Sequence, residues 1–293
     1  MKVLLFGSNG MLGQAIDKVF KSAGISMVTA ARYNADYCFD FTNDKYIEKC
    51  FENEWPDIVI NAAAIVDLSF CEKEVGRAYQ VNARFPAVLS ELCKKYNCYY
   101  VHVSTDHYYT GDNEKKHLET DPVILINEYA RTKYAGEQFV MTNTNALVLR
   151  TNIVGFRENG NPTFIEWAIS ELKSNKKMNL FNDFYTSSMH TIDFANVLLD
   201  IIKIKPYGVY NVACSDVVNK RDFVLGLSKV LFSKKPVYDE VSVNSLVSVK
   251  RGDSLGLDVS KIEDLLGYCM PGIEETMESI KKEYLERKQK YEV

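Results

Sequence analysis

The chain has 293 residues, of which 46% are hydrophobic and 25% are charged, which is ordinary for a globular protein. Its length exceeds that of one typical single-core domain, so we expect two domains. The 35 basic and 39 acidic side chains leave a net charge of -4, which argues against a nucleic-acid partner.

The cysteines and histidines argue against a disulfide-stabilised protein and against a metal-binding protein. The seven cysteines form no Cys-x-x-Cys pair and the four histidines are scattered, which favours reduced thiols and predicts no metal site. The apolar run before "GSNG" is too short for a signal peptide or for a membrane span of about 20 apolar residues. We therefore expect a cytoplasmic protein without a membrane partner.

In the first half of the chain, short apolar runs alternate with amphipathic segments. The expected strands are "KVLLFG" (2–7), "ISMVTA" (25–30), "DIVINAAA" (57–64), "YYVHVST" (99–105) and "NALVLRT" (145–151). The expected helices cover 11–24, 43–53, 74–96 and 127–142. This alternation predicts an α/β fold with a Rossmann-type doubly wound parallel sheet.

The regular alternation of expected strands and helices ends after Thr151. A loop, "GFRENGNP", precedes an expected helix over 163–175, and a helix followed by "GVYNVA" within 190–213 indicates a return to the first domain. Ile273, Met277, Ile280 and Tyr284 mark the buried stripe of a C-terminal helix. We expect a first domain over 1–155, with 190–213 returning to it, and a smaller C-terminal α/β cap from 156–189 and 214–293.

The turn after the first strand carries the first functional motif. "GSNGMLG" places Gly7, Gly10 and Gly13 between a strand and a helix. Glycines let the backbone approach a pyrophosphate closely, and the helix N-terminus offers free N–H groups to it. We therefore expect dinucleotide binding rather than a plain structural turn, with contacts from Gly7, Asn9, Gly10, Met11, Leu12 and Gly13.

The end of the second strand bears on the choice of cofactor. A carboxylate there suits the ribose of NAD, whereas arginine suits the additional phosphate of NADP. The sequence reads "TAARYNAD", so Arg32 is the expected phosphate contact; the alternative is a solvated charge. Asp40 and Phe41 are expected near the adenine. NADPH is favoured over NADH, and use of both stays open.

Tyr129 and Lys133 stand four residues apart on an expected helix, so their side chains project from one face. A lysine cation favours the tyrosinate, which would bring a phenol of ordinary pKa near about 10 closer to neutrality. Ser104 and Thr105 end an expected strand at the edge where such folds bind ligands. Together these residues predict a carbonyl-reducing site; the alternative is a coincidental spacing on an ordinary helix.

Over most of its length the chain resembles an extended short-chain dehydrogenase/reductase. It is most similar to the dTDP-4-dehydrorhamnose reductase family of sugar-nucleotide 4-ketoreductases. The resemblance rests on "GSNGMLG", "NAAAIVD", "VNARFP", "VSTDHYYTG", "NEYARTKYAGEQ" and "LVLRTNIVG", and more faintly on "IDFANVLL" and "RGDSLGLDVSK".

The resemblance implies roles for individual residues. Thr105, Tyr129 and Lys133 would be catalytic, and Lys133 would also orient the nicotinamide ribose. Asn61, Ala62, Ala63 and Ala64 would line the cofactor, and Asp67 and Asn82 would support nearby loops. The implied substrate contacts are Val66, Ser104, Asp106, His107, Asn152 and Arg251, with Arg251 meeting the diphosphate.

The implied activity is NAD(P)H-dependent reduction of a 4-keto sugar attached to a nucleotide, in surface-polysaccharide or deoxysugar biosynthesis. His107 stands at the third position of the "TDE" motif that supplies the acid and base of sugar-nucleotide dehydratases, so the resemblance does not extend to dehydration. Ile153, Gly155, Ser188 and Met189 stand where rhamnose-pathway relatives usually carry aromatic, proline or threonine residues, which predicts a different sugar cavity. An epimerase or epimerase-reductase with His107 as a second acid/base, a non-catalytic NADP-binding regulatory subunit and a homodimer all stay open.

Overall fold

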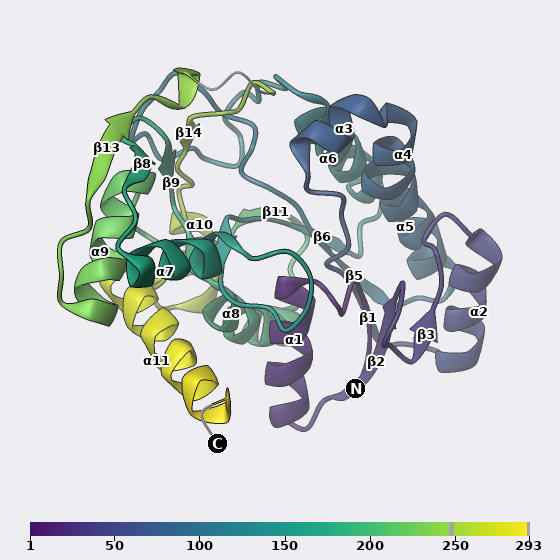
Figure 1. Cartoon of the computed structure of the whole chain (residues 1–293). Coiled ribbons are helices and arrows are strands. Elements are labelled where there is room, and N and C mark those ends of the chain that lie inside the picture. Colours follow the sequence, from purple (N-terminus) through teal and green to yellow (C-terminus); the bar gives the residue numbers. More distant parts are fainter. Residues whose placement is uncertain (246–248, 292–293) are drawn as a thin grey trace.

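The computed structural model describes residues 1–245 and 249–291. Its main feature is a seven-stranded parallel sheet in the order β11-β6-β5-β4-β1-β2-β3 (Figure 1). The strands are β1 (Lys2–Phe6), β2 (Ser26–Ala31), β3 (Tyr37–Cys38), β4 (Ile58–Asn61), β5 (Tyr99–Val103), β6 (Ala146–Arg150) and β11 (Gly208–Asn211). The predicted fold class is confirmed.

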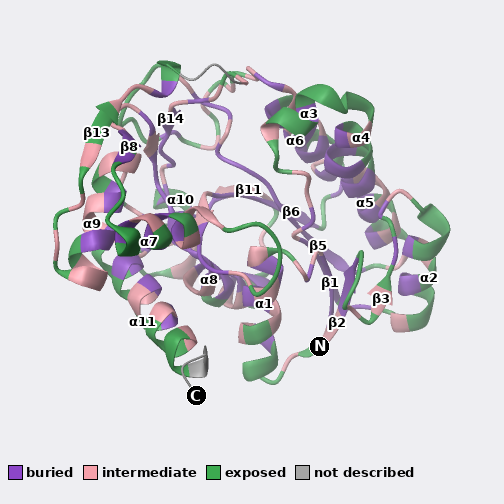
Figure 2. Cartoon of the chain, viewed as in Figure 1, coloured by how far each residue is buried: buried purple, intermediate pink, exposed green. Residues whose placement is uncertain are grey.

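Both faces of the sheet are buried. Successive side chains along a strand point to opposite faces, so each strand contributes to two hydrophobic clusters. Val3 and Leu5 of β1 lie in one hydrophobic cluster, and Leu4 and Phe6 lie in another on the opposite face. The sheet therefore runs through the buried centre of the domain, with exposed residues on the surrounding helices (Figure 2). A continuous apolar run such as "KVLLF" is the sequence pattern of such a strand.

Helices cover the sheet from both sides. The first cluster contains residues of α1 (Met11–Ser22), α8 (Thr191–Ile204) and α10 (Ser260–Leu266), and the second contains residues of α2 (Asp44–Glu54) and α5 (Phe85–Lys95). α6 (Glu128–Val140) packs against α5. The predicted helices at 11–24, 43–53 and 127–142 are confirmed to within a few residues.

The helix predicted over 74–96 is confirmed as a continuous helical run from Val75 to Lys95, made of α4 (Val75–Tyr79), a π-helical turn (Gln80–Arg84) and α5. The short α3 (Leu68–Lys73) before it was not predicted. Glu74 leaves the helical conformation with φ -116° and ψ 53°. Pro86 has no N–H to donate to the Asn82 carbonyl, and the Phe85 N–H bonds instead to Gln80, five residues back.

That π-helical turn lets α6 approach closely. A Cβ at Gly136 would lie 2.3 Å from the Asn82 carbonyl oxygen. We expect Gly136→Ala to lower the free energy of unfolding by about 1–3 kcal/mol, because backbone would have to move. The matched control is Gly76→Ala in α4, which meets nothing within 4 Å and should gain up to about 1 kcal/mol. Urea unfolding measures both; equal effects would contradict the close packing.

A smaller set of elements forms the cap. Its strands are β7 (Ile153–Val154), β8 (Met178–Phe181), β9 (Tyr185–Thr186), β10 (Met189–His190), β12 (Val218–Asn219), β13 (Tyr238–Val241) and β14 (Ser254–Leu255). Its helices are α7 (Phe164–Ser174), α9 (Lys220–Phe232) and α11 (Ile273–Tyr291), with a 3-10 turn at Val243–Ser245. The cap has its own hydrophobic cluster, in which Met277 and Ile280 are buried and Ile273 and Tyr284 are partly buried, so the predicted stripe of the C-terminal helix is confirmed.

The predicted return of 190–213 corresponds to α8 and β11: α8 packs on α1, and β11 pairs with β6 at the sheet edge. α10, from the region assigned to the cap, also packs against β11. The division of the chain into two domains stays a prediction. Within residues 1–245 and 249–291, no helix has the length and apolar character needed to cross a membrane.

Candidate active site

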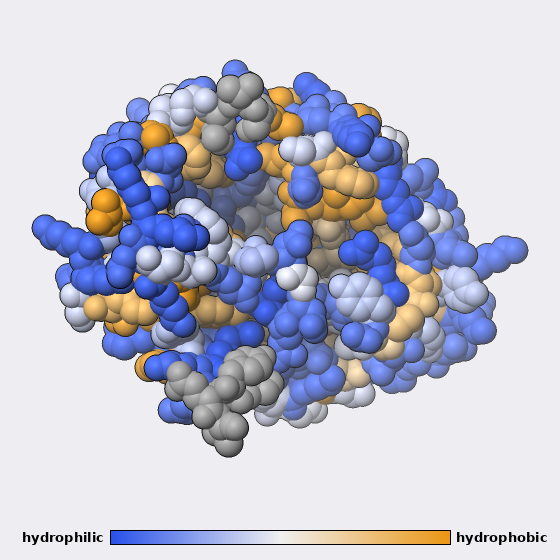
Figure 3. Space-filling model, viewed as in Figure 1, coloured by the Kyte–Doolittle hydropathy of each residue, from blue (hydrophilic) through white to orange (hydrophobic). Residues whose placement is uncertain are grey.

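A cavity of about 940 Å³ opens at the carboxyl ends of the parallel strands, between the sheet and the cap. The space-filling view shows the hollow in the middle of this face (Figure 3). The expected residues that line it are Gly7, Asn9, Gly10, Met11, Leu12, Arg32, Asp40, Phe41, Ala62, Ala63, Ala64, Val66, Ser104, Thr105, Asp106, His107, Tyr129, Lys133 and Asn152. The fold thus gathers side chains from seven separate segments around one space.

The glycine turn has the geometry that the motif predicts. Gly7 has φ +86°, and a Cβ there would lie 2.6 Å from the Ala63 amide nitrogen. Gly10, the N-cap of α1, has no side chain to cap the helix, so the first N–H groups stay available to an anion. Gly13 does not line the cavity; a Cβ there would lie 2.1 Å from the Gly7 carbonyl oxygen. It lets α1 pack against the turn.

Asn61 also lies outside the cavity lining. Its side chain is fully buried under the "NAAAIVD" loop, where Oδ1 accepts a hydrogen bond of 3.0 Å from the Ala63 amide. Nδ2 lies 3.2 Å from Nδ1 of His102. Asn61 therefore supports the loop that borders the cofactor space instead of contacting that space itself.

The outer end of the cavity carries two guanidinium groups. Arg32 is exposed on the lining and has no ion-pair partner within the part of the chain that the structure describes. Arg77, which the sequence reading missed, also lines the cavity and pairs with Asp40. Asp36 is turned away, because its carboxylate accepts hydrogen bonds of 2.8 and 2.7 Å from Thr29. This end suits a phosphate better than a free ribose diol.

We expect Arg32→Ala to weaken NADPH binding by about 10- to 100-fold, because a hydrogen bond to a charged group contributes about 1.5–3 kcal/mol. NADH binding should change by less than about twofold. Titration of both dinucleotides by fluorescence measures the ratio. Arg84→Ala, which removes a surface partner of Asp44 outside the lining, is the control; equal losses of NADPH and NADH would remove Arg32 as the phosphate contact.

α6 presents Tyr129 and Lys133 to the inner end of the cavity. Asn127 caps the helix by accepting a hydrogen bond of 2.8 Å from the Ala130 amide, and its Nδ2 donates to the Lys250 carbonyl at 3.0 Å. This pair of bonds fixes the start of α6 against the cap. Tyr129 is 7% exposed and Lys133 is 1% exposed.

The expected acidification of Tyr129 by Lys133 is wrong for this structure. Lys133 Nζ donates a 2.8 Å hydrogen bond to the Val103 carbonyl and lies 3.4 Å from His102. Burial raises the pKa of Tyr129 above its ordinary value, and the hydrogen bond with Thr105 only partly offsets this. Burial lowers the pKa of Lys133 to about 8. The phenol is therefore fully protonated near neutrality, which is the form that a proton donor needs.

His107 packs edge-on against Tyr129, with ring centroids 5.4 Å apart at 87°. Burial, together with the charges of Arg251 and Lys220, lowers the pKa of His107 to about 4. The imidazole is thus neutral at physiological pH and a weak base. This environment fits a lining residue better than the acid/base of an epimerase.

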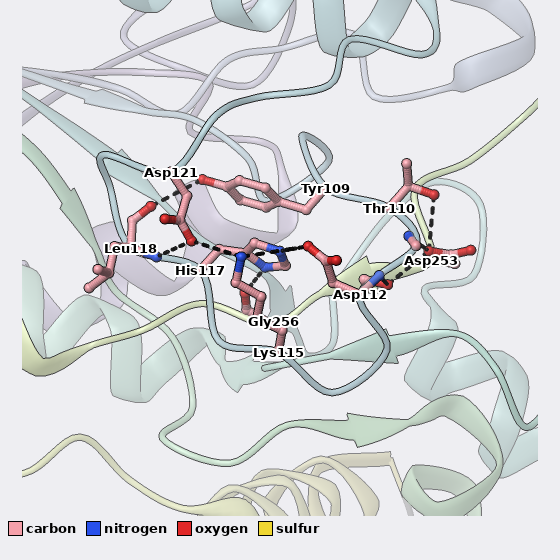
Figure 4. A network of polar contacts seen from close by, with 11 residues as sticks. Tyr109, Thr110, Asp112, Lys115, His117, Leu118, Asp121, Asp253 and Gly256 are labelled. Atoms are coloured by element: carbon pink, nitrogen blue, oxygen red, sulfur yellow. Dashed lines mark hydrogen bonds and ion pairs between the residues drawn. The ribbon is translucent and has the colours of Figure 1, made fainter.

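The segment after His107 is tied to the cap by a polar network (Figure 4). The His117 ring stacks on Tyr109 with centroids 3.9 Å apart. Its two nitrogens face the Gly256 carbonyl at 2.9 Å and the Asp112 carboxylate at 3.1 Å. Asp253 accepts hydrogen bonds from Thr110 and Gly111 at 3.0 and 2.8 Å. The wall that carries His107 is therefore held against β14.

Several resemblance-based expectations concern neighbours of the cavity. Asn82 supports the 62–67 loop through bonds of 2.8 and 2.9 Å with the Ile65 backbone, and Asp67 caps α3 by accepting from Phe70. Arg251 does not line the cavity; its contact with a diphosphate stays a prediction. Ile153 and Gly155 line the cavity, where Gly155 leaves room for Thr191.

The sequence reading missed one wall entirely. The segment after β7 lines the cavity with Arg157, Asn159, Gly160, Asn161, Thr163, Phe164 and Ile165. Its position after a strand of the fold and its glycine content are the signals that could have identified it. Among the residues that the structure describes, no group of three histidine, cysteine or acidic side chains is placed to hold a metal ion.

The chain is similar to known reductases over most of its length. The dTDP-4-dehydrorhamnose reductase of Aggregatibacter actinomycetemcomitans is 27% identical over 91% of this chain and 93% of its own length. The probable low-salt glycan biosynthesis reductase Agl14 of Haloferax volcanii is 26% identical over 96% of this chain and 97% of its own. A crystal structure of dTDP-4-dehydrorhamnose reductase from Bacillus anthracis in complex with NADP shares the fold, with a TM-score of 0.87 at 24% identity over 96% and 99% of the two chains.

A family model described as the RmlD substrate binding domain matches residues 1–285. The match covers the sheet, the cavity and the cap, so it is not confined to the glycine motif. The chain belongs to the RmlD substrate-binding-domain family.

Proposed function

We propose that this protein is an NAD(P)H-dependent reductase that converts a keto group of a nucleotide-linked sugar, such as a 4-keto-deoxysugar, to a hydroxyl. One observation carries the proposal. Thr105, Tyr129 and Lys133 share a cavity with the glycine turn at the carboxyl edge of a Rossmann-type sheet. Family membership and the reductases similar to this chain support the same reaction class.

The residues fit a dinucleotide. The space that a Cβ at Gly7 would fill and the uncapped N-terminus of α1 suit the pyrophosphate. Arg32 and Arg77 at the outer end favour NADPH over NADH, and the Bacillus anthracis relative was crystallised with NADP. When bound, the nicotinamide supplies a hydride to the keto carbon.

Residues of this chain donate the proton that the carbonyl oxygen needs. As the carbonyl oxygen gains negative charge, Tyr129 transfers its phenolic proton to that oxygen, and the C=O becomes a CH–OH group. Thr105 donates a hydrogen bond to the same oxygen and so stabilises the developing charge. The tyrosinate then regains a proton from water. Lys133, anchored to the Val103 carbonyl, would orient the ribose of the dinucleotide.

The sugar would lie between this edge and the cap, against Val66, Ser104, Asp106, His107 and Asn152. We place the reaction in surface-polysaccharide or deoxysugar biosynthesis, and the protein in the cytoplasm, where its seven unpaired cysteines would stay reduced. A homodimer remains a hypothesis. An epimerase-type reaction is the weaker candidate, because His107 is half-buried and has a pKa lowered to about 4.

The test is a screen of 4-keto nucleotide-sugars for consumption of NADPH, with a parallel thermal-shift assay, because a ligand that binds the native state raises its melting temperature. We expect one substrate class both to stabilise the protein and to oxidise NADPH. Deuterium wash-in at ring carbons would identify an epimerase. Thermal stabilisation without NADPH oxidation for every compound would favour a non-catalytic, regulatory NADP-binding protein.

A further inference from the structure

A lysine in the cap lies behind the sugar end of the cavity, and nothing in the sequence reading assigned it a role. Lys220 is the first residue of α9. Its ammonium lies 4.8 Å from the ring centroid of Phe164, 5.6 Å from that of Phe223 and 5.8 Å from that of Phe184. Three ring faces attract and confine the cation, so its position is built into the cap.

A chain of hydrogen bonds runs from this ammonium to the cavity wall. Lys220 Nζ donates to Ser188 Oγ at 3.3 Å, and Ser188 Oγ donates to Asn152 Oδ1 at 2.6 Å. Asn152 Nδ2 then donates to Asp106 Oδ2 at 2.6 Å. An ammonium only donates and the Asn152 Oδ1 only accepts, so Ser188 accepts from Lys220 and gives its proton to Asn152, which fixes the orientation of the amide. Thr186, whose hydroxyl lies 2.9 Å from Ser188 Oγ, then donates to Ser188 as well. One oxygen of Asp106 is thereby held, and the other stays beside Thr105.

The charge states of Asp106 and Lys220, at the two ends of this hydrogen-bond chain, depend on each other. Asp106 is 1% exposed, and burial raises its pKa to about 7, while the charge of Lys220 opposes this shift. Burial lowers the pKa of Lys220 to about 8, and Asp106 opposes that shift. The other titratable or charged groups nearby are His107, Tyr129 and Arg251. Near neutrality, the ionised state of Asp106 therefore depends on the cation behind it.

We propose that Lys220 is a positioning residue that holds Asp106 as an oriented carboxylate, which accepts a hydrogen bond from a sugar hydroxyl next to the keto carbon. An ionised carboxylate can only accept hydrogen bonds, so the site selects a sugar with a free hydroxyl there over its deoxy analogue. The inference rests on the function proposed above and narrows its substrate class. It assigns Lys220, Ser188 and Asn152 to substrate selection through Asp106.

The kinetic test uses Lys220→Met, which removes the charge and keeps most of the side-chain stem. We expect KM for the keto-sugar nucleotide to rise about tenfold and the acid limb of kcat/KM to move up by about one pH unit, because an opposite charge is lost. KM for NADPH should stay the same. Lys220→Arg should restore the acid limb, and Ser188→Ala should raise the sugar KM while keeping the charge.

The matched control is Lys173→Met, which removes another cation from an aromatic ring in the cap, 5.2 Å from the centroid of Tyr284, and should change neither KM nor the acid limb. An acid limb that does not move in Lys220→Met would overturn the inference while leaving the reductase function standing. The deoxy analogue should be a poor substrate of the wild type and insensitive to Lys220→Met.

A second measurement is independent of turnover. Asp106 has a raised pKa in the folded state, so its ionisation costs stability as pH rises through about 7, and Lys220 offsets part of that cost. The melting temperature of Lys220→Met should therefore fall further below wild type at about pH 7.5 than at about pH 5.5. The extra deficit should shrink in an Asp106→Asn background, where only the titration of Lys220 itself is left. Equal deficits at both pH values would refute the coupling even if no substrate were found.

Discussion

Tyr129→Phe is expected to lower kcat by about 10²- to 10⁴-fold, the usual contribution of a positioned general acid. The phenylalanine ring keeps the packing against His107 and removes only the transferable proton. Because burial raises the pKa of Tyr129, the wild-type phenol stays protonated across neutral pH. Steady-state NADPH oxidation with the best keto-sugar nucleotide measures the loss, and dinucleotide titration should show NADPH affinity within about twofold of wild type.

The control for this variant is Tyr134→Phe on the same helix. Tyr134 packs against Tyr108, with ring centroids 5.7 Å apart, and does not line the cavity. It should keep nearly full turnover. A Tyr129→Phe protein with wild-type kcat would exclude the phenol as proton donor, whereas parallel losses in both variants would indicate damage to α6.

Glu137→Gln is expected to lower the free energy of unfolding by about 3–5 kcal/mol, because it leaves a buried guanidinium without its counter-charge. Glu137 is fully buried and Arg150 is 4% exposed, and their closest contact is 2.8 Å. Tyr108 donates to Glu137 at 2.9 Å, and Arg150 donates to Tyr109 at 3.1 Å. The cluster thus joins α6, the end of β6 and the segment that follows His107.

Urea unfolding without dinucleotide measures this effect. The control is Glu128→Gln, which breaks the partly exposed pair with Arg131 at the other end of α6 and should cost about 1 kcal/mol or less. Similar changes in the two proteins would show that the buried pair contributes no more than a surface pair. We also expect Glu137→Gln to reduce turnover, because the same helix carries Tyr129 and Lys133.

Much of the first domain could be predicted because its signals are local. Apolar runs bounded by glycine and polar segments identify buried strands, and "GSNGMLG" has a meaning wherever it joins a strand to a helix. The helix over 74–96 could be predicted for the same reason, but the π-helical turn inside it could not. Pro86 withholds an N–H from Asn82, an effect that apolar periodicity does not reveal.

Some residues of the site could be predicted from sequence motifs, whereas others are brought to it only by the fold. Most of the expected residues line one cavity, because a parallel sheet brings the carboxyl ends of its strands to one edge. Gly13 and Asn61 belong to the motifs but do not line the cavity. Gly13 allows α1 to pack against the glycine turn, and Asn61 supports the loop that contains Ala63. Arg77 and Lys220 come from segments without a recognisable motif, so only their positions in the fold connect them to the site.

By itself, the sequence determined the order of the main strands and helices of the first domain, the glycine turn and the presence of a hydroxyl, a phenol and an amine suited to carbonyl reduction. The tertiary structure decided where those groups point and how they titrate. Lys133 donates a hydrogen bond to the Val103 carbonyl, and Asp106 owes its pKa of about 7 to burial, opposed by a lysine 114 positions later. Burial and charge partners arise from segments far apart in the chain, so residue spacing alone does not specify them.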